Sequence, residues 1–265
     1  MNLELGDHHV LITGGSKGIG LACAQGFLAE GARVTLVARD LSALAAARAM
    51  LLAGGVAPER VGTQGADLRD PAQALAAIDA AEAALGPVQV LVNSAGAARR
   101  TPADELTPQA WADAMQAKYF TYIHAMDVLV KRMAQREGGA IVNVVGAGGK
   151  VASPIHLPGG AANAALMLVT AGLANAYGAR GVRVNAVNPG QTHTTRLQQG
   201  LEAEARLKGV DTDEALAQIN ARLPLGRIAR PEEVADAVLF LASARASYVT
   251  GAILSMDGAL TPMVV

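Results

Sequence analysis

A glycine-rich segment near the amino terminus has the residue types that bind a phosphate group. The run Thr-Gly-Gly-Ser-Lys-Gly-Ile-Gly spans residues 13–20, between an apolar stretch and an alanine-rich one. Glycines remove side chains where a turn must approach a pyrophosphate, and the first turn of the following helix offers unpaired N–H groups to the anion. A strand before the turn and a helix after it make such a triplet informative. The segment predicts a dinucleotide site that contains Gly14, Ser16, Lys17, Gly18, Ile19 and Gly20.

The end of the next apolar run indicates which dinucleotide is bound. An NAD site places a carboxylate there to accept the ribose hydroxyls, but this chain has Ala38 followed by Arg39. A guanidinium suits the 2′-phosphate of NADP because it forms charge-assisted, bidentate hydrogen bonds. Lys17 supplies a second cation, whereas the nearby Asp40 keeps NAD open as an alternative. We therefore expect NADP(H), with NAD less favoured.

Short apolar runs alternate with longer alanine- and leucine-rich stretches, and these elements must position the site. The apolar runs lack in–out alternation, which is typical of parallel strands covered on both faces. This pattern predicts an α/β Rossmann-type fold, with a doubly wound, mostly parallel seven-stranded sheet and helices on both faces, as one domain over residues 1–265. Expected strands are residues 9–13, 33–38, 61–66, 88–93, 140–145, 182–187 and 252–256. Expected helices are residues 17–29, 41–53, 71–84, 108–136, 158–177 and 231–242.

One segment, residues 191–225, breaks this alternation because it is polar. It follows an expected strand, and the ligand crevice of an open α/β sheet lies beyond the carboxyl ends of the strands. We expect a helical lid over that crevice. The alternative is an ordinary solvated surface helix.

Further motifs resemble those of the short-chain dehydrogenase/reductase family, from the first strand to near the carboxyl terminus. Three segments are similar to those that the family uses around the adenine, after the fourth strand and at the nicotinamide. They are, in that order, Asp67-Leu68, Asn-Ser-Ala-Gly at 93–96 and Asn-Pro-Gly-Gln-Thr-His-Thr at 188–194. The resemblance implies an oxidoreductase acting on a small carbonyl/alcohol pair. It also implies a homotetramer or homodimer with two long helices paired across a two-fold axis. It adds to the expected cofactor site Asp67, Leu68, Asn93, Ala95, Gly96, Pro189, Gly190, Thr192 and Thr194.

The residues with which that family transfers a proton are missing from their usual positions. The family uses an upstream Ser, a helical Asn and a Tyr-x-x-x-Lys motif whose Lys lowers the tyrosine pKa toward the working pH. Here Gly146 replaces the Ser, Gly159 the Tyr, Asn163 the Lys and Lys118 the Asn, and no tyrosine is followed by Lys four residues later. Either other groups transfer the proton, or the chain is a catalytically inactive NADP(H)-binding protein that acts as a sensor or partner subunit.

Three side chains are the main candidates for a catalytic role. Lys118 and Asn163 look like an exchange of the family's Asn and Lys, so an ammonium could still reach the nicotinamide ribose. The alternative is that Lys118 is a helix-surface lysine. His156 precedes Gly159 by three residues, and imidazoles titrate near neutrality; otherwise it is a solvated loop histidine. Weaker candidates are Tyr122, Ser153 and His193.

Glycines gather where the family's Ser and Tyr are missing. They predict open space beside the nicotinamide, with a collapsed pocket as the equal alternative. The glycines concerned are Gly146, Gly148, Gly149, Gly159 and Gly160.

The composition disfavours several other classes of protein. A net charge of −1 gives no electrostatic footprint for nucleic acid or an anionic membrane. Residues 151–179 lack charged side chains and are long enough to span a membrane, but their Ser, His, Asn, Gly and Pro argue against a span. With one cysteine, Cys23, and no signal-peptide pattern, we expect a cytoplasmic protein. No His or Cys spacing is typical of a metal site, so none is expected.

Overall fold

The sheet of this protein is a seven-stranded, all-parallel sheet. The computed structural model describes residues 2–96, 100–195, 197–198, 201 and 209–262. The strands are β1 (His9–Thr13), β2 (Arg33–Ala38), β3 (Val61–Gly65), β4 (Val90–Asn93), β5 (Gly139–Val144), β6 (Val182–Pro189) and β7 (Ile253–Met256). They are ordered β3-β2-β1-β4-β5-β6-β7, and every neighbouring pair is parallel. The predicted Rossmann-type sheet is confirmed, and its strand order reverses between β1 and β4, where such sheets bind ligands.

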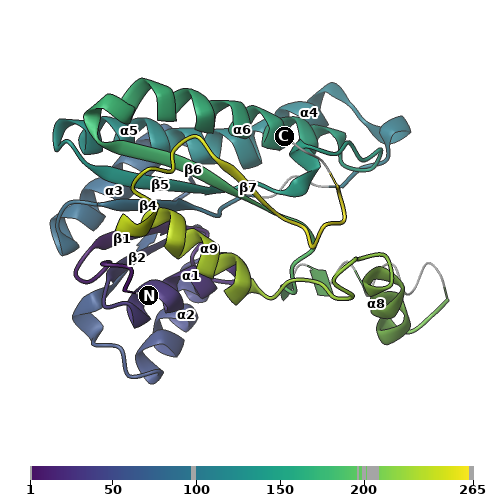
Figure 1. The fold of residues 1–265 in the computed structure, drawn as a ribbon, viewed down its shortest axis with the longest axis horizontal. Coiled ribbons are helices and arrows are strands. Elements are labelled where there is room, and N and C mark those ends of the chain that lie inside the picture. The colour runs from purple at the N-terminus through teal and green to yellow at the C-terminus, as the bar shows by residue number, and fades with distance from the viewer. Residues whose placement is uncertain (1, 97–99, 196, 199–200, 202–208, 263–265) are drawn as a thin grey trace.

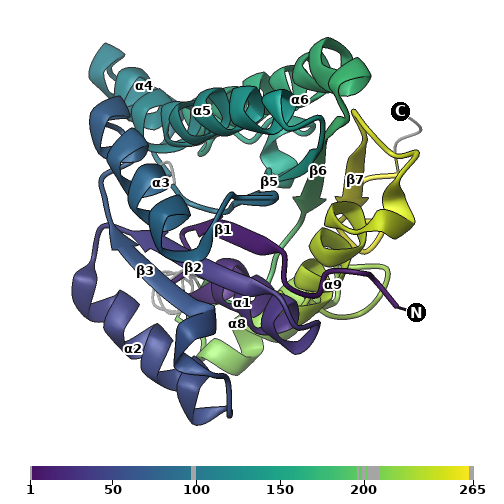
Figure 2. The ribbon, with the colours of Figure 1, turned by 90° about the vertical axis from the view of Figure 1, so that its left-hand side faces the viewer.

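Helices cover both faces of the sheet (Figures 1 and 2). One layer holds α1 (Gly18–Ala29), α2 (Leu41–Ala53) and α9 (Pro231–Ala242). The other holds α3 (Pro71–Leu85), α4 (Pro108–Ala114), α5 (Thr121–Gln135) and α6 (Leu157–Tyr177). Each layer packs its own cluster of buried side chains against the sheet. All five residues of β1 are buried, as a strand covered on both faces requires. Short 3₁₀ turns are Pro58–Arg60, Ala103–Glu105, Ala147–Gly149 (η4), Gly178–Arg180 and Ala244–Ala246.

Several element boundaries differ from those expected by one or two residues, and the fourth helix differs more. Strand β4 begins at Val90, and the Val88 N–H donates to the Glu82 carboxylate at 2.8 Å and not to a neighbouring strand. The single helix expected over residues 108–136 is interrupted by a π-helical turn, Met115–Phe120 (η3), between α4 and α5. Such turns insert one extra residue and are frequent at functional sites.

The expected lid segment contains one described helix, α8 (Thr212–Asn220). Figure 1 shows α8 standing apart from the two helical layers, beyond the carboxyl end of β6. A small apolar cluster that includes Leu201 and Ala215 packs within the segment. Residues 196, 199–200 and 202–208 of the expected lid lie outside the described residues, and the lid stays a prediction.

Helix α6, with its continuation to Arg180, is long and apolar enough to cross a membrane by length and composition alone. In this fold it lies in the helical layer of α4 and α5 and packs on β6 (Figure 2). A core helix passes the same test of length and composition, and its buried residues Ala162, Leu166 and Ala174 face the protein interior.

Candidate functional site

The turn between β1 and α1 is compact because glycine occupies its closest approaches. Gly14 has φ +69°, and a Cβ there would lie 2.8 Å from the Cα of Ala95. A Cβ on Gly20 would lie 2.3 Å from the Gly14 carbonyl oxygen. No side chain caps the amino end of α1, whose N-cap residue is Lys17. The first-turn N–H groups therefore face the turn without a side-chain acceptor, and the turn is a cradle suited to a phosphate.

A cleft of about 960 Å³ runs over this turn along the carboxyl ends of β1, β2 and β4. Of the residues expected in the cofactor site, those that line it are Gly14, Ser16, Lys17, Gly18, Ile19, Arg39, Asp67, Leu68, Ala95, Gly96 and Thr194. Val37, Ala38, Asp40, Ala43, Ala66, Arg69, Ser94, Ala117, Thr121 and Thr195 complete its wall. Its volume and its position suit a dinucleotide.

Positive charge lines one end of the cleft. Within the described residues, the side chains of Lys17 and Arg39 have no hydrogen-bond or ion-pair partner. The Asp40 carboxylate is engaged as the N-cap of α2, since it accepts from Ser42 Oγ at 2.7 Å and from the Ala43 N–H at 3.0 Å. The Ser42 hydrogen bond, followed by the Ala43 one, lowers the pKa of Asp40. The Asp40 carboxylate, which kept NAD as an alternative cofactor, is thus bound to the amino end of α2.

A further cation in the wall, Arg69, was not anticipated from the sequence. Its Nε donates to both Asp67 carboxylate oxygens at 3.0 Å. The hydrogen bond from Arg69 holds the pKa of Asp67 below its usual value. The only sequence signal was the position of Arg69, two residues after Asp67 in the run Ala-Asp-Leu-Arg-Asp. The Arg69–Asp67 ion pair fixes the segment that follows β3 in the wall of the cleft.

Five of the expected cofactor residues lie outside the cleft lining. Gly20 packs against Gly14. Gly190 is tied to β7 through the Met256 carbonyl at 3.1 Å, and Thr192 is bridged to Ala229. The remaining two are Asn93 and Pro189, at the ends of β4 and β6.

The Asn93 side chain is fully buried and forms part of a polar chain through the core. Its Oδ1 accepts from Thr13 Oγ1 at 3.2 Å, and its Nδ2 donates to Asn143 Oδ1 at 3.0 Å. Asn143 donates in turn to Thr170 Oγ1 on α6 at 3.0 Å. Thr13 Oγ1 also accepts from the Ser94 and Ala95 N–H groups at 3.1 and 3.3 Å. This series of hydrogen bonds fixes the turn after β4, so Asn93 shapes the cleft although its side chain does not line it.

The space that the sequence predicts around Gly159 is filled by the His156 ring. A Cβ on Gly159 would lie 2.1 Å from Cε1 of His156, and one on Gly148 would lie 3.3 Å from Cδ2 of the same ring. A Cβ on Gly149 would lie 2.8 Å from Cε of Met167. Of the two alternatives, the geometry therefore supports the collapsed pocket at these glycines. Without them, η4 could not pack this closely on α6.

Asn163, which the resemblance aligns with the family's lysine, lies beside Gly146. Its side chain is 5% exposed, and its Nδ2 lies 3.3 Å from where a Cβ on Gly146 would be. Its Oδ1 is buried and has no hydrogen-bond partner among the described residues. Buried polar atoms are nearly always paired. This acceptor is available to a donor such as a ribose hydroxyl.

Lys118 is buried, so its assignment as a surface lysine is wrong. Its Nζ donates to the Tyr122 hydroxyl at 2.6 Å and to the Val144 carbonyl at 3.1 Å. It lies 4.1 Å from the centroid of the Tyr122 ring. The Tyr122 hydroxyl donates to the same carbonyl at 2.7 Å. Tyr122 is 0% exposed, and burial raises its pKa, so it is a packed residue and a poor proton donor.

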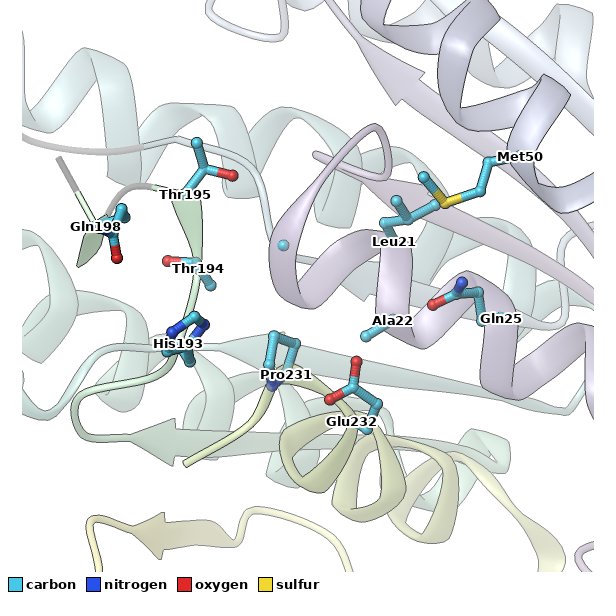
Figure 3. A pocket seen from close by; sticks show the side chains of 11 residues that line it. Leu21, Ala22, Gln25, Met50, His193, Thr194, Thr195, Gln198, Pro231 and Glu232 are labelled. Atoms are coloured by element: carbon cyan, nitrogen blue, oxygen red, sulfur yellow. The ribbon is translucent and has the colours of Figure 1, made fainter. Parts of the chain in front are cut away.

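Ser153 and His193, the other weak catalytic candidates, lie apart from Lys118 and Tyr122. The Ser153 carbonyl accepts from the His156 N–H at 2.9 Å. His193 is exposed and lines a second hollow of about 550 Å³ between α1, the start of α9 and residues 193–195 and 198. Figure 3 shows His193, Thr194 and Glu232 around that hollow. Gly18, Thr194 and Thr195 border both hollows. In the described part of the chain, no three His, Cys, Asp or Glu residues are grouped to hold a metal ion.

Comparison with known proteins gives matches over nearly the whole chain. Residues 14–261 match the family model described as enoyl-(acyl carrier protein) reductase. The chain is 37% identical to 2-(S)-hydroxypropyl-CoM dehydrogenase 3 of Xanthobacter autotrophicus, over 98% of this chain and 99% of that protein. It is 34% identical to the inactive 2-(S)-hydroxypropyl-CoM dehydrogenase 2 of the same organism, over 90% of this chain and 99% of that one.

Among solved structures, the chain is similar to an NADPH-bound short chain oxidoreductase of Pseudomonas aeruginosa PAO1 with an atypical catalytic center. The TM-score is 0.87 at 32% sequence identity, over 98% of this chain and 100% of that one.

Proposed function

The chain belongs to the short-chain dehydrogenase/reductase family, and on that premise we propose an NADP(H)-dependent oxidoreductase that interconverts a small carbonyl compound and its alcohol, with His156 transferring the proton. The observation that carries the proposal is the position of the His156 ring, which fills the space a side chain on residue 159 would need. In the family that side chain is the proton-transferring tyrosine. An imidazole suits the same task because it exchanges a proton near neutral pH.

The cleft supports NADP(H) as the cofactor. When bound, the nicotinamide supplies or accepts the hydride, and the protein contributes binding, orientation and proton transfer. The turn at Gly14 and Gly18 would hold the pyrophosphate. Lys17 and Arg39 would hold the 2′-phosphate, since both line the cleft and neither has another partner in the described part of the chain. The NADPH-bound Pseudomonas oxidoreductase further supports this choice.

Asn163 is proposed to orient the nicotinamide ribose. Its buried Oδ1 would accept a hydrogen bond from a ribose hydroxyl, which removes the cost of leaving a buried acceptor unpaired. An amide carries no charge, so it cannot lower the pKa of a neighbouring acid as the family's lysine does. The proton-transfer group must therefore be one that titrates near neutrality by itself, which favours His156 over a hydroxyl.

A catalytically inactive NADP(H)-binding protein is the second candidate function. It is favoured by the filled space at Gly149 and Gly159, which leaves little room for a substrate. The inactive Xanthobacter relative supports the same candidate.

One experiment separates the two functions. NADPH is titrated by its fluorescence, and loss of its absorbance is then followed with a panel of small aldehydes and ketones. Turnover that falls in His156→Ala by on the order of 10²-fold or more supports the enzyme, with His193→Ala as the matched control outside the main cleft. NADPH binding without consumption of any carbonyl supports the inactive binder. Absence of NADPH and NADH binding at millimolar concentration overturns both.

We also propose that the chain is a cytoplasmic homo-oligomer that pairs through α6. The outer face of α6 is apolar, and Leu168 on it is 76% exposed. Small neighbours such as Ala164 and Ala171 permit close helix packing. Light scattering after gel filtration tests the assignment, since Leu168→Glu should shift the wild-type dimer or tetramer toward a smaller species.

A further inference from the structure

We propose that Arg69 is a further determinant of cofactor binding. Its guanidinium forms a stacking platform for the purine base of the dinucleotide, while its ion pair with Asp67 withdraws that carboxylate from the 6-amino group of the base. The protein should therefore not distinguish adenine from hypoxanthine in the cofactor. This inference rests on the proposed function, because it requires that NADP(H) occupies the cleft. It concerns binding alone, so it applies whether or not the protein turns over a substrate.

The order of the strands determines which end of the cleft receives the base. Strand β2 lies between β1 and β3, and its last residue, Ala38, pairs with Gly65 at the end of β3. The proposed pyrophosphate turn follows β1, and Arg39, which would hold the 2′-phosphate, follows β2. The base and the 2′-phosphate are attached to adjacent carbons of one ribose. Because the β1 side is used by the pyrophosphate, the base lies on the β3 side, against residues 66–69.

Residues 66–69 form a part of the cleft wall that suits a flat aromatic ring. Ala66, Leu68 and Arg69 all line the cleft, and the first two offer apolar contact. The Arg69 side chain is 49% exposed, so a ligand can reach it. Its Nε and Nη2 both donate to the Asp67 carboxylate, which fixes the plane of the guanidinium. A guanidinium whose in-plane donors are engaged in this way still offers its face, on which purine bases stack.

The hydrogen-bond acceptors of Asp67 and Leu68 are already engaged. Asp67 Oδ1 accepts from the Arg69 N–H at 3.1 Å, and both carboxylate oxygens accept from Arg69 Nε at 3.0 Å. The Asp67 carbonyl accepts from the Asp70 N–H at 3.0 Å, and the Leu68 carbonyl accepts from Nδ1 of His124 at 2.9 Å. The 6-amino group of adenine is a donor and needs an acceptor. Its replacement by the oxygen of hypoxanthine therefore costs little at this wall.

The charges around the ion pair agree with this placement of the base. The hydrogen bond from Arg69, and to a smaller extent the charge of Arg39, lower the pKa of Asp67. The carboxylate therefore stays ionised at neutral pH, and its pair with Arg69 persists there. Because Arg39 acts on Asp67, the two arginines border the same part of the cleft. The 2′-phosphate and the base of one nucleotide would lie side by side at that position.

The test compares NADPH with its analogue, reduced nicotinamide hypoxanthine dinucleotide phosphate. The two molecules share the 2′-phosphate and the fluorescent reduced nicotinamide, so the same titration gives both dissociation constants. The wild-type protein should bind them with affinities that agree within about twofold.

Arg69→Leu keeps an apolar side chain and removes the guanidinium. It should bind the hypoxanthine analogue about fivefold more weakly than the wild-type protein does, because a cation–π contact is lost. NADPH should recover part of this loss, because the freed Asp67 carboxylate can accept from its 6-amino group. The variant should then prefer NADPH over the analogue by about tenfold.

Two controls accompany this measurement. In the double variant Arg69→Leu with Asp67→Ala the preference for NADPH should disappear, because the freed carboxylate is absent. In Arg39→Ala both cofactors should bind more weakly by the same factor, because the 2′-phosphate is common to them.

Each outcome bears on one claim. If the wild-type protein binds neither cofactor, the proposed function fails. If it distinguishes the two by more than about twofold, or if the analogue binds Arg69→Leu as tightly as it binds the wild-type protein, the inference is overturned and the proposed function stands. Thermal melting shows whether Arg69→Leu folds. If it does not, the wild-type comparison decides by itself: equal affinities support the inference, and a preference for NADPH overturns it.

Discussion

His156 and Gly159 share one volume: a Cβ on residue 159 would lie 2.1 Å from Cε1 of the imidazole. The absence of a side chain at 159 is therefore a condition for the position of His156. Both residues lie around the amino end of α6, where His156 is the N-cap residue and Gly159 is buried in the first turn. The glycine at position 159 and the placement of the imidazole are two aspects of one local arrangement.

The first prediction follows from that relationship. Gly159→Ala should displace the imidazole while the helix still forms, because alanine is a better helix former than glycine. Turnover should fall on the order of 10²-fold, as expected when a proton-transfer group is lost. In the double variant with His156→Ala the fall should be no greater than in either single variant, since both remove the same interaction. Steady-state kinetics of the four proteins measure this, and two independent, additive losses would contradict it.

The pH dependence of turnover gives a second prediction. Reduction of a carbonyl consumes a proton, so His156 must start as the imidazolium. kcat/KM for reduction should therefore fall as pH rises, and kcat/KM for alcohol oxidation, which needs the neutral ring, should rise over the same range. Rates measured from pH 5.5 to 9 in both directions test the sign. In His156→Ala the residual rate should lose this inflection, and an inflection that persists unchanged would assign it to another group.

A third prediction concerns stability and involves His9 in β1. Its Nδ1–H donates to the Gly86 carbonyl at 2.6 Å, so in the neutral ring Nε2 accepts from Thr35 Oγ1 at 2.9 Å. Burial lowers the pKa of His9 below its ordinary value of 6.5. The unfolded chain thus binds the proton more readily than the folded one, and the free energy of unfolding should decrease as pH falls below about 6.5.

Urea unfolding at pH 7.5, 6.5 and 5.5 tests the His9 prediction. His9→Gln cannot titrate, so its stability should change less between these pH values than that of the wild-type protein, whatever its absolute stability. Burial also lowers the pKa of His8, so that ring adds to any slope that remains in His9→Gln. An equal slope in both proteins would show that His9 makes no contribution.

The fold could be predicted because its signals are local. Strands such as β1 are buried along their whole length, and their unbroken apolar runs distinguish them from the helices in the sequence. The glycine spacing between β1 and α1 likewise reports a backbone requirement that no other residue meets at Gly14 and Gly20. Side-chain partners at long range leave no such signal. The burial of Asn93 and the contact of Lys118 with Val144 depend on how β4, β5 and α5 meet.

The details of the loop before α6 could not be predicted for the same reason. Glycines at 148, 149 and 159 indicate either open space or close packing, and only the positions of His156 and Met167 decide between them. The π-helical turn that carries Lys118 interrupts a stretch, residues 109–136, with no proline or glycine in it, so no breaker residue marks it.

The last prediction concerns Arg39 and the choice between the two dinucleotides. Arg39 lines the cleft without a partner in the described part of the chain, whereas the Asp40 carboxylate is held by Ser42 and the amino end of α2. Arg39→Ala should weaken NADPH binding by at least about tenfold, because a charge-assisted hydrogen bond to the 2′-phosphate is lost. NADH binding in the same variant should change little and serves as the internal control, since NADH lacks that phosphate. Asp40→Asn should leave the affinity for both dinucleotides nearly unchanged, because its amide oxygen can still cap α2.

Fluorescence titration of each variant with NADPH and NADH measures the four affinities. If Arg39→Ala weakens the binding of both dinucleotides equally, the guanidinium contacts a part of the cofactor that they share. If Asp40→Asn causes a large loss of NADH binding, the Asp40 carboxylate binds the ribose hydroxyls.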